Sequence, residues 1–458
     1  MRTTDVRVFG IQHDERRKKP SFRLRWKVAG KPFSYTARTK GLAEAYQGKL
    51  RQAMRDGEEF DTATGLPPSL EEKAADVSWY EFALTYLALR WPHVSPNYRD
   101  EINEGLTEAT KALLRDTPGR PSDAALQHAL REWAFVLPGP GERELPPEVV
   151  RVLGWVAKAS RPLAEVKEPV VVREVLDSFK LRLDGKAAAG ATARRKRKTF
   201  VAALNYAVDR GDFAENPVHG VKWEKPKVAT EVDPRVVANP AQAVSLLTAV
   251  SYVGGYHRAR GRRLVGLFGA MYYAGLRPAE AIGLSEDDCT LPARGWGSAT
   301  LHRTRPTAGK RWTDTGEVHD DRGLKNRAAE DTRVVPLPPR LVVILKESIR
   351  THGVAEDGRL FFNERRGVLG SSTYDRVWHE AREFGLPPRL VRSPLAHRPY
   401  DLRHSALSTW LNAGVDPTEV AERAGNSVEV LLARYAKCLY GRREIANQRI
   451  EALLDEYN

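Results

Sequence analysis

The sequence predicts a multidomain protein that is mainly α-helical with small β elements. Its length of 458 residues suggests about three domains, because a domain averages about 150 residues. Two polar runs that contain several Pro or Gly residues, at 57–78 and 224–238, are typical of linkers. We therefore expect a small sheet-and-helix domain at 1–62, a helical domain at 75–224 and a mixed α/β domain at 235–458.

The first domain is predicted to contain three strands and a helix. Apolar and cationic residues alternate through residues 22–28 (FRLRWKV), which is the period of a strand with one buried face. A turn at Ala29-Gly30 leads to a second alternating strand at 33–37, and residues 5–11 offer a third strand. Helical spacing of apolar residues over 43–54 predicts a helix that covers the apolar face.

Positive charge is concentrated in this first domain. The chain has 73 Lys and Arg against 59 Asp and Glu, a net charge of +14, and residues 1–60 hold 15 Lys and Arg against 7 Asp and Glu. A field of this sign favours polyanions, nucleic acid first and an anionic membrane second. A cationic strand fits the major groove of DNA, so we predict DNA contact by Arg23, Arg25 and Lys27. The alternative is that these cations are simply the solvated side of a half-buried sheet.

A second cationic run lies in the helical domain. Its members are Arg194, Arg195, Lys196, Arg197 and Lys198, at the start of a helix that continues through residues 199–208. Five consecutive cations exceed what one helix face holds, so we predict that part of this run binds DNA phosphates. A nuclear localisation signal is the other interpretation that such a run allows. The helix should end at Gly211, and Asn216-Pro217 should stop any continuation.

Nothing in the sequence calls for a metal ion or another cofactor. Cys289 and Cys438 are far apart and lack the C-x-x-C spacing of a zinc site, and two cysteines make no disulfide framework. The sequence has neither a carboxylate cluster nor a Gly-rich phosphate loop. It also lacks the apolar core of a signal peptide and any run of 18 apolar residues. We therefore expect a cytoplasmic protein that does not span a membrane.

Three local signals with chemical meaning follow one another in the last domain. Residues 273–280 (YAGLRPAE) end one helix and begin another, which places an arginine at a helix entrance suited to an anion. Residues 400–404 (YDLRH) open a second helix, and residues 426–435 (NSVEVLLARY) cap a third helix and end in a tyrosine. Each signal alone is weak, because an arginine on a helix is more often a surface ion pair. The side chains of interest are Arg277, Arg403, Asn426 and Tyr435.

In this order, the three signals resemble those of the tyrosine recombinase (phage-type integrase) family. Residues 275–280 match its box G-L-R-x-x-E, residues 401–404 match its second box, and Tyr435 lies 32 residues after the second arginine, as the family places it. The resemblance covers residues from about 165 to 450 and implies a helical core-binding domain followed by a mixed α/β catalytic domain. The first 60 residues are similar to the arm-binding domains, three strands and a helix, that some integrases carry.

The resemblance assigns a role to each motif residue. Arg277 and Arg403 would clamp the two non-bridging oxygens of the scissile phosphate with a donor geometry that lysine lacks. Tyr435 would be the nucleophile and would form a 3′-phosphotyrosyl ester, which conserves bond energy for rejoining. A lysine on a β-hairpin between the two boxes would protonate the leaving 5′-oxygen. Lys325 is the best match for this lysine, and Lys310 is the alternative because the hairpin is long.

Two positions depart from the family's pattern. Tyr400 stands where the family has the first His of its second box, and Asn426 stands where it commonly has His or Trp. We expect both side chains to belong to the catalytic site and to position phosphate, since Asn donates a hydrogen bond but carries no proton at neutral pH. His404 is a further candidate, although a packed structural histidine agrees equally well with the sequence. The identity of the general base is therefore open.

We expect a site-specific DNA recombinase that integrates or excises a phage or other mobile element. The family implies double-stranded DNA attachment sites as partners, a homotetramer on these sites, and an accessory factor that bends DNA or promotes excision. The tail at 445–458 has enough apolar residues to dock on a neighbouring subunit or on its own domain. Two alternatives stay open: a DNA-binding protein of this fold that has lost its activity, and a topoisomerase with the same tyrosine chemistry.

Overall fold

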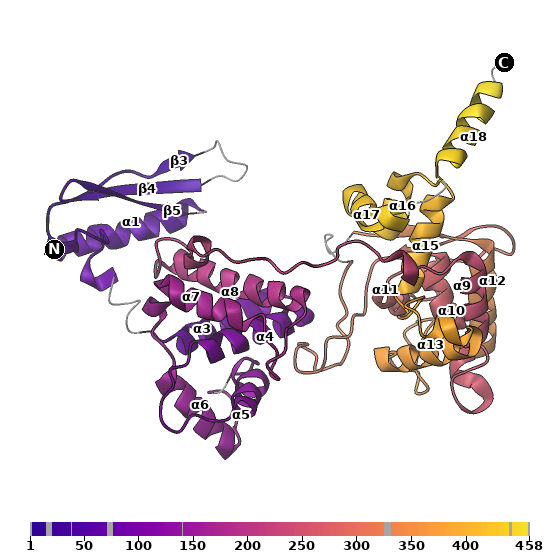
Figure 1. Cartoon of the computed structure of the whole chain (residues 1–458), viewed down its shortest axis with the longest axis horizontal. Helices are drawn as coiled ribbons and strands as arrows, with labels where there is room; N and C mark the ends of the chain where they lie inside the picture. Colours follow the sequence, from indigo (N-terminus) through magenta and orange to yellow (C-terminus); the bar gives the residue numbers. More distant parts are fainter. Residues whose placement is uncertain are drawn as a thin grey trace. The chain divides into compact units, whose positions relative to one another are not determined.

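The computed structural model describes residues 2–14, 21–37, 39–70, 77–139, 141–324, 331–438 and 442–456. The chain forms two compact units, Met1–Val228 and Ala229–Asn458. Helices predominate in both units, and the strands of the described residues form three small sheets (Figure 1). The predicted fold class, mainly α with small β elements, is confirmed. No helix among the described residues is long and apolar enough to cross a membrane.

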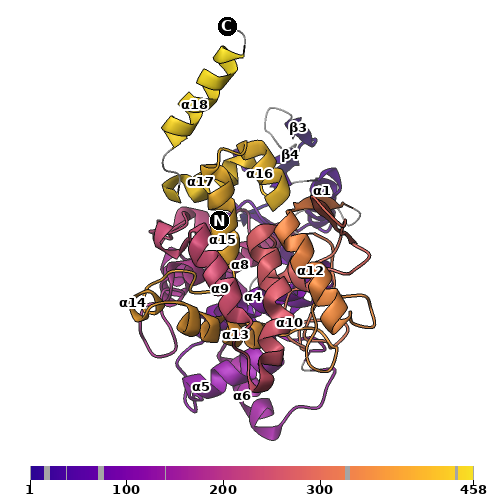
Figure 2. The same cartoon turned by 90° about the vertical axis from the view of Figure 1, so that its right-hand side faces the viewer.

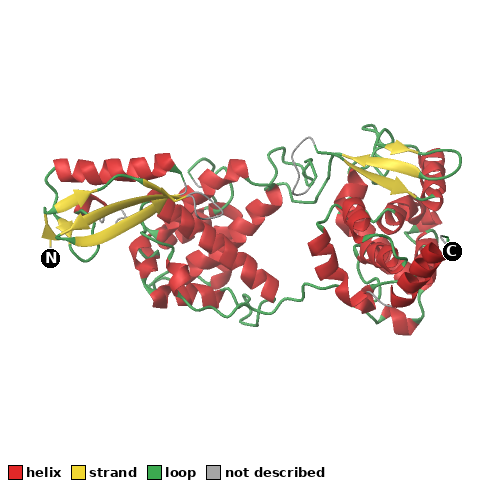
Figure 3. Cartoon of the chain, turned by 90° about the horizontal axis from the view of Figure 1, so that it is seen from above, coloured by secondary structure: helices red, strands yellow, loops and turns green. Residues whose placement is uncertain are grey.

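The first unit begins with a sheet that is backed by a helix (Figure 3). Its elements are β1 (Arg2–Thr3), β2 (Val6–Val8), β3 (Gln12–Asp14), β4 (Ser21–Val28), β5 (Lys31–Ala37), α1 (Lys40–Arg55) and β6 (Phe60–Asp61). β4 pairs antiparallel with β5 along one edge and with β2 and β3 along the other, while β1 pairs with β6. The turn between β4 and β5 has two residues, Ala29 and Gly30, with φ of 48° and 77°. Two left-handed residues are typical of a tight hairpin turn whose twist matches that of the strands.

The alternation predicted for β4 is confirmed. Every second side chain is buried in the core between the sheet and α1, and the side chains between them are exposed. The buried members are Leu24, Trp26 and Val28, and the exposed members are Arg23, Arg25 and Lys27. One face of the strand therefore presents three cations to solvent.

The interpretation of residues 57–78 as a linker is wrong for their first part. Phe60 is fully buried in the core of this sheet. The indole nitrogen of Trp26 donates to the carbonyl oxygen of Gly65 over 2.7 Å, which ties the segment to the sheet. The segment was interpreted as a linker because most of its residues are polar, Gly or Pro, and its few apolar residues are widely spaced. Residues 71–76 of the predicted linker lie outside the described residues.

The rest of the first unit is helical, as predicted. Its elements are α3 (Trp79–Arg90), η1 (Trp91–His93), α4 (Pro96–Ala112), α5 (Asp123–His128), η2 (Ala129–Ala134), α6 (Pro147–Ala159), η3 (Leu163–Lys167), α7 (Pro169–Ser178), α8 (Gly190–Arg210) and η4 (Pro217–Gly220). α4 and α8 approach so closely at Gly105 that a Cβ atom there would lie 2.6 Å from the Cβ of Thr199. α8 ends at Gly211 with φ of 86°, the left-handed cap that the sequence predicted.

The second unit is a bundle of helices with one small sheet (Figure 2). Its elements are η5 (Pro234–Val236), α9 (Pro240–Val250), η6 (Tyr256–Arg258), α10 (Ala259–Tyr273), α11 (Pro278–Gly283), β7 (Cys289–Thr290), β8 (Gly297–Leu301), β9 (Arg333–Leu337), α12 (Pro339–His352), α13 (Ser371–Gly385), α14 (Pro388–Val391), α15 (Asp401–Asn412), α16 (Pro417–Ala424), α17 (Val428–Tyr435), η7 (Ala436–Cys438) and α18 (Arg442–Asp455). The sheet is antiparallel in the order β7-β8-β9. α9, α10, α12 and α13 supply half of the buried residues of the unit's main core.

Two sequence predictions need correction in this unit. The sequence patterns at 301–305 and 333–337 predict two short strands that flank a polar hairpin. β9 matches the second range, but β8 begins earlier than the first, because alternate residues from Gly297 onward face the core. The predicted linker at 224–238 is packed in its second half. Val232 is buried beside α17, and its backbone nitrogen donates to the carbonyl oxygen of Arg434 over 2.7 Å. Residues from about 229 onward therefore belong to the second unit.

Candidate active site

The junction between α10 and α11 positions the first arginine of the site. Gly275 has φ of 62°, and a Cβ atom there would lie 2.9 Å from the indole ring of Trp410. The chain turns here and α11 begins directly after Arg277. Glu280 accepts from the backbone nitrogen of Arg277 over 2.8 Å and from its Nη1 over 2.6 Å, so its carboxylate caps the start of α11. The box G-L-R-x-x-E thus encodes a turn, an arginine and the carboxylate that orients it.

α15 brings the second arginine into the same place. Arg403 is fully buried, its Nη1 donates to the carbonyl oxygen of Gly275, and its Nη2 donates to the carbonyl oxygen of Ala424 over 2.6 Å. By contrast, the side chain of Arg277 is 22% exposed. The two predicted arginines therefore meet at the α10–α11 turn, one buried and one open to solvent.

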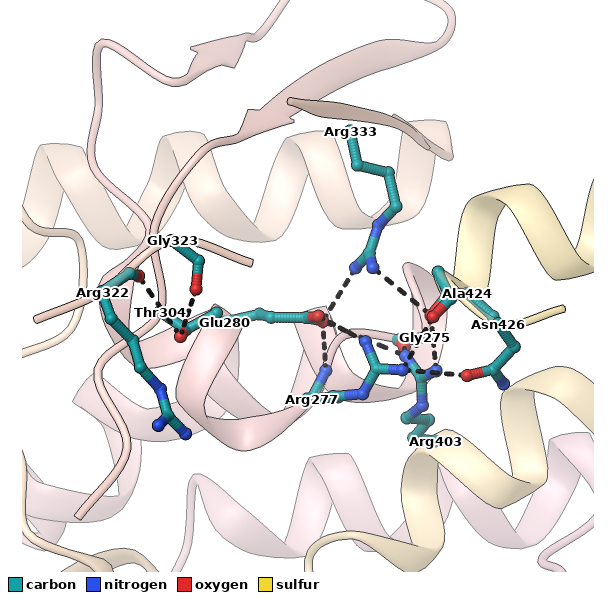
Figure 4. Close-up of polar contacts among 11 residues, drawn as sticks. Gly275, Arg277, Glu280, Thr304, Arg322, Gly323, Arg333, Arg403, Ala424 and Asn426 are labelled. Carbon is teal, nitrogen blue, oxygen red and sulfur yellow. Dashed lines mark hydrogen bonds and ion pairs between the residues drawn. The ribbon is translucent and has the colours of Figure 1, made fainter. Parts of the chain in front are cut away.

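The turn after α16 also holds both arginines, because its carbonyl oxygens accept hydrogen bonds from each of them (Figure 4). Gly425 has φ of 61° and reverses the chain between α16 and α17. Nη2 of Arg277 donates to the carbonyl oxygen of Gly425 over 3.0 Å and to Oδ1 of Asn426 over 2.9 Å. This arrangement directs the donor side of the Asn426 amide away from Arg277, as a phosphate-binding role requires. The structure thus places the predicted Asn426 beside the predicted Arg277.

The predicted nucleophile is paired with a histidine. The hydroxyl oxygen of Tyr435 lies 2.8 Å from Nδ1 of His404, and the tyrosine is 1% exposed. Burial, reinforced by Arg434 and Arg403, lowers the pKa of His404 to about 3. Tyr400 contacts the same imidazole edge-on, with ring centroids 5.0 Å apart. The candidate histidine therefore contacts the tyrosine directly and is neutral at physiological pH.

Sequence reasoning missed one charged residue of this site. Arg333, the first residue of β9, is 4% exposed, and its Nη2 lies 2.8 Å from Oε2 of Glu280. Its Nη1 donates to the carbonyl oxygen of Ala424 over 3.4 Å. A signal was present, because Arg333 alternates in phase with the buried residues Val335 and Leu337 of the same strand. An arginine at an inward strand position is seldom solvated and needs a partner.

The two candidate lysines of the hairpin differ in position. Lys325 lies outside the described residues. Leu324, which precedes it, is buried in the core. On the other side of the hairpin, the backbone nitrogen of Arg305 donates to the carbonyl oxygen of Ala279 in α11 over 2.9 Å. Lys310 is exposed and lies towards the tip of the hairpin, beyond the bridge between residues 307 and 319.

The cationic run on α8 is partly neutralised within its own unit. Nη2 of Arg195 lies 2.5 Å from a carboxylate oxygen of Glu104, and Lys196 is buried with its Nζ 3.9 Å from Glu108. The other members point elsewhere: Arg197 lies over Trp223, Lys198 lies over Tyr98, and Arg194 is exposed. The structure thus narrows which part of the run is available to phosphate, because Arg195 and Lys196 already have acidic partners.

No family model and no curated protein matches the chain. The chain is similar to several solved structures. The Tn1549 transposon integrase in complex with a circular intermediate DNA has a TM-score of 0.47 at 18% identity, over 65% of this chain and 90% of that one. The XerH site-specific recombinase bound to its difH substrate has a TM-score of 0.43 at 15% identity, over 74% and 92%. The lambda integrase bound to DNA has a TM-score of 0.40 at 14% identity, over 64% and 92%. These three solved structures are integrases or site-specific recombinases, the class that the motifs of the chain led us to expect.

Proposed function

We propose that the protein is a site-specific DNA recombinase that cleaves and rejoins strands through a 3′-phosphotyrosyl intermediate on Tyr435. The observation that carries this proposal is the convergence of two arginines on one turn in a site where a buried tyrosine is bonded to a neutral histidine. Such a set suits in-line attack on a phosphodiester, whose non-bridging oxygens gain charge as the tyrosine oxygen approaches.

The proton of the nucleophile passes to His404 in this mechanism. Nδ1 already lies at hydrogen-bond distance from the Tyr435 hydroxyl, and the neutral imidazole accepts. Positive charge on Arg434 and Arg403 contributes to the lowered pKa of His404. A bound phosphodiester would offset that positive charge and so make the imidazole a stronger base. Binding of DNA would therefore activate the base at the point where it is needed.

The leaving 5′-oxygen needs a proton from another group, and we assign this role to Lys325. The residue before Lys325, Leu324, is buried in the core. Arg322 is bridged to Thr304, which precedes the residue bonded to α11. Lys310 lies further along the hairpin and is solvated. A proton donor must reach the leaving oxygen directly or through one water, which favours the lysine that follows a core residue over the one towards the hairpin tip.

The DNA partner is proposed to be a duplex attachment site of a phage or other mobile element, bound by a homotetramer. Support for duplex binding comes from the exposed cationic face of β4 (Arg23, Arg25 and Lys27) and from Arg194 and Lys198 on α8. Support for assembly comes from α18, which presents Ile450, Leu453 and Leu454 to solvent. Arg449 of α18 donates to the carbonyl oxygens of Ala413 and Gly414 in its own unit.

A duplex with a nick close to the cleavage site tests the proposal. Cleavage releases the short fragment that carries the leaving 5′-hydroxyl, so the strand cannot be rejoined and the covalent intermediate accumulates. We expect a protein–DNA adduct whose peptide map places the DNA on Tyr435. A tight complex without an adduct would identify the DNA-binding protein that has lost activity. Relaxation of a plasmid without any attachment site would identify a topoisomerase instead.

A further inference from the structure

Arg333 is a third guanidinium of the site, and it is nearly as buried as Arg403. It is 4% exposed, whereas the side chain of Arg277 is 22% exposed. Its two terminal nitrogens face Oε2 of Glu280 at 2.8 Å and the carbonyl oxygen of Ala424 at 3.4 Å. Arg333 therefore contacts the carboxylate that orients Arg277 and the carbonyl oxygen that also accepts from Arg403 (Figure 4).

The charge of Glu280 explains why a third arginine is present. This carboxylate is 1% exposed and lies 2.6 Å from a nitrogen of Arg277, 2.8 Å from one of Arg333 and 4.0 Å from one of Arg403. A buried carboxylate must be balanced by positive charge. Without Arg333, the balance would fall on the two arginines whose charge the phosphate needs.

The pKa of Glu280 agrees with a charge-balancing role for Arg333. Burial alone would raise the pKa of Glu280, but Arg333 first, and then Arg277 and Arg403, hold that pKa below its usual value. Among the opposite charges, Arg333 thus has the largest effect on the carboxylate that orients Arg277.

The turn after α16 is shaped around the same side chain. A Cβ atom on Gly425 would overlap Nη1 of Arg333, so this position needs glycine for space as well as for its φ of 61°. The preceding carbonyl, that of Ala424, accepts from Arg403 over 2.6 Å as well as from Arg333. Arg333 therefore holds the peptide on which Arg403 is also anchored.

We propose that Arg333 is a positioning residue for strand cleavage: it neutralises Glu280 and fixes the Ala424–Asn426 turn, so that Arg277 and Arg403 keep their charge and orientation for the scissile phosphate. The proposal rests on the recombinase function proposed above. Through Arg333, the start of β9 is connected with Arg277 and Arg403, and β9 follows the hairpin that carries Lys325. In this role Arg333 acts through Glu280 and the Ala424 carbonyl oxygen.

The test compares cleavage of two nicked duplexes by the full-length protein. One has an ordinary scissile phosphate, and the other has a methylphosphonate, in which an uncharged methyl group replaces one non-bridging oxygen. For Arg333→Met we expect adduct formation to slow about 10²-fold on the phosphate, the scale of losing one oxyanion donor. On the methylphosphonate, which has less charge to stabilise, we expect the loss to shrink to less than about tenfold. A defect of folding alone would slow both substrates equally.

Arg359→Met is the matched control. Arg359 is also buried, at 6% exposed, and pairs with Asp357, which keeps a second arginine partner at 3.2 Å in Arg305. We expect this variant to cleave both duplexes like the unmodified protein. If Arg333→Met fails to fold by its melting curve, Arg333→Lys, which keeps the charge, takes its place and should show a smaller loss with the same dependence on substrate.

A paired substitution separates charge balance from packing. Glu280→Gln together with Arg333→Met removes both charges, so the double variant should cleave the phosphate duplex faster than Arg333→Met alone. A double variant that is no faster, or an equal loss on both duplexes, would overturn the positioning role. Failure of the unmodified protein to form any adduct would overturn the recombinase function and this inference with it. Normal adduct formation by both Arg333 variants would overturn the inference alone.

Discussion

Nδ1 of His404 lies 2.8 Å from the hydroxyl oxygen of Tyr435, and both side chains are buried. Burial raises the pKa of Tyr435, with Arg403 opposing the shift, so the phenol keeps its proton until a base removes it. Burial lowers the pKa of His404, so the imidazole is in the form that accepts that proton. One hydrogen bond thus connects the candidate nucleophile with the candidate base, and it makes specific predictions for each partner.

Replacement of Tyr435 by Phe should abolish the covalent adduct while leaving DNA affinity nearly unchanged. The substitution removes one oxygen from a buried ring and keeps its packing. Adduct formation on a nicked duplex and binding by gel shift measure the two properties separately. Tyr440→Phe is the control and should still trap DNA. If the Tyr435→Phe variant still formed an adduct, Tyr440 would become the nucleophile to test.

Replacement of His404 by Gln should change how stability depends on pH. The folded state lowers the pKa of His404 from about 6.5 to about 3, so between these values the unfolded chain binds a proton that the folded protein does not. Stability from this group is therefore complete above about pH 6.5 and is lost as the pH falls towards 3, by at most roughly 1.4 kcal/mol per pH unit. Denaturant unfolding at pH 7, 6 and 5 measures the loss. The advantage of the unmodified protein over His404→Gln should shrink with falling pH, and a constant difference would contradict a buried neutral histidine.

Neutralising the cationic face of β4 should weaken DNA binding in a salt-dependent way. Arg23, Arg25 and Lys27 are exposed, so changing all three to Gln leaves the buried core of the sheet intact. Each phosphate contact that is lost should lower the slope of log affinity against log salt concentration by about 0.9. The matched control changes three exposed cations on α1, which packs on the other side of the sheet: Lys49, Arg51 and Arg55. Equal slopes for the two triple variants would rule out a DNA-binding role specific to the strand.

The sequence allowed much of the local structure to be predicted, because local structure follows from local chemistry. Alternation in residues 22–28 predicted both the strand and its exposed cations, and Gly211 and Gly275 predicted chain reversals. The motif spacing brought Arg277 and Asn426 together in the expected way, since turn and cap residues fix how helices begin and end.

What the sequence concealed were contacts between distant segments. Nothing near Arg333 in the chain reveals that Glu280, 53 positions earlier, will be its partner. Phe60 and Val232 were assigned to linkers because polar neighbours dominate their surroundings, yet each packs into a core built by other elements. The role of His404 was open for the same reason, because its partner is 31 residues away.

The last prediction concerns the proton that the leaving 5′-oxygen requires. Loss of a general acid should slow cleavage by about 10²–10⁴-fold on ordinary DNA. A substrate with sulfur in place of the 5′-bridging oxygen needs no such proton, because a thiolate leaves unaided. Lys325→Ala should therefore be slow on normal DNA and nearly normal on the sulfur substrate. Arg277→Ala should be slow on both, since the role proposed for Arg277 is to stabilise charge on the non-bridging oxygens. Rescue of Lys310→Ala instead of Lys325→Ala would move the acid towards the tip of the hairpin. If neither lysine variant is rescued, His404, which would hold the tyrosine proton after attack, becomes the donor to test.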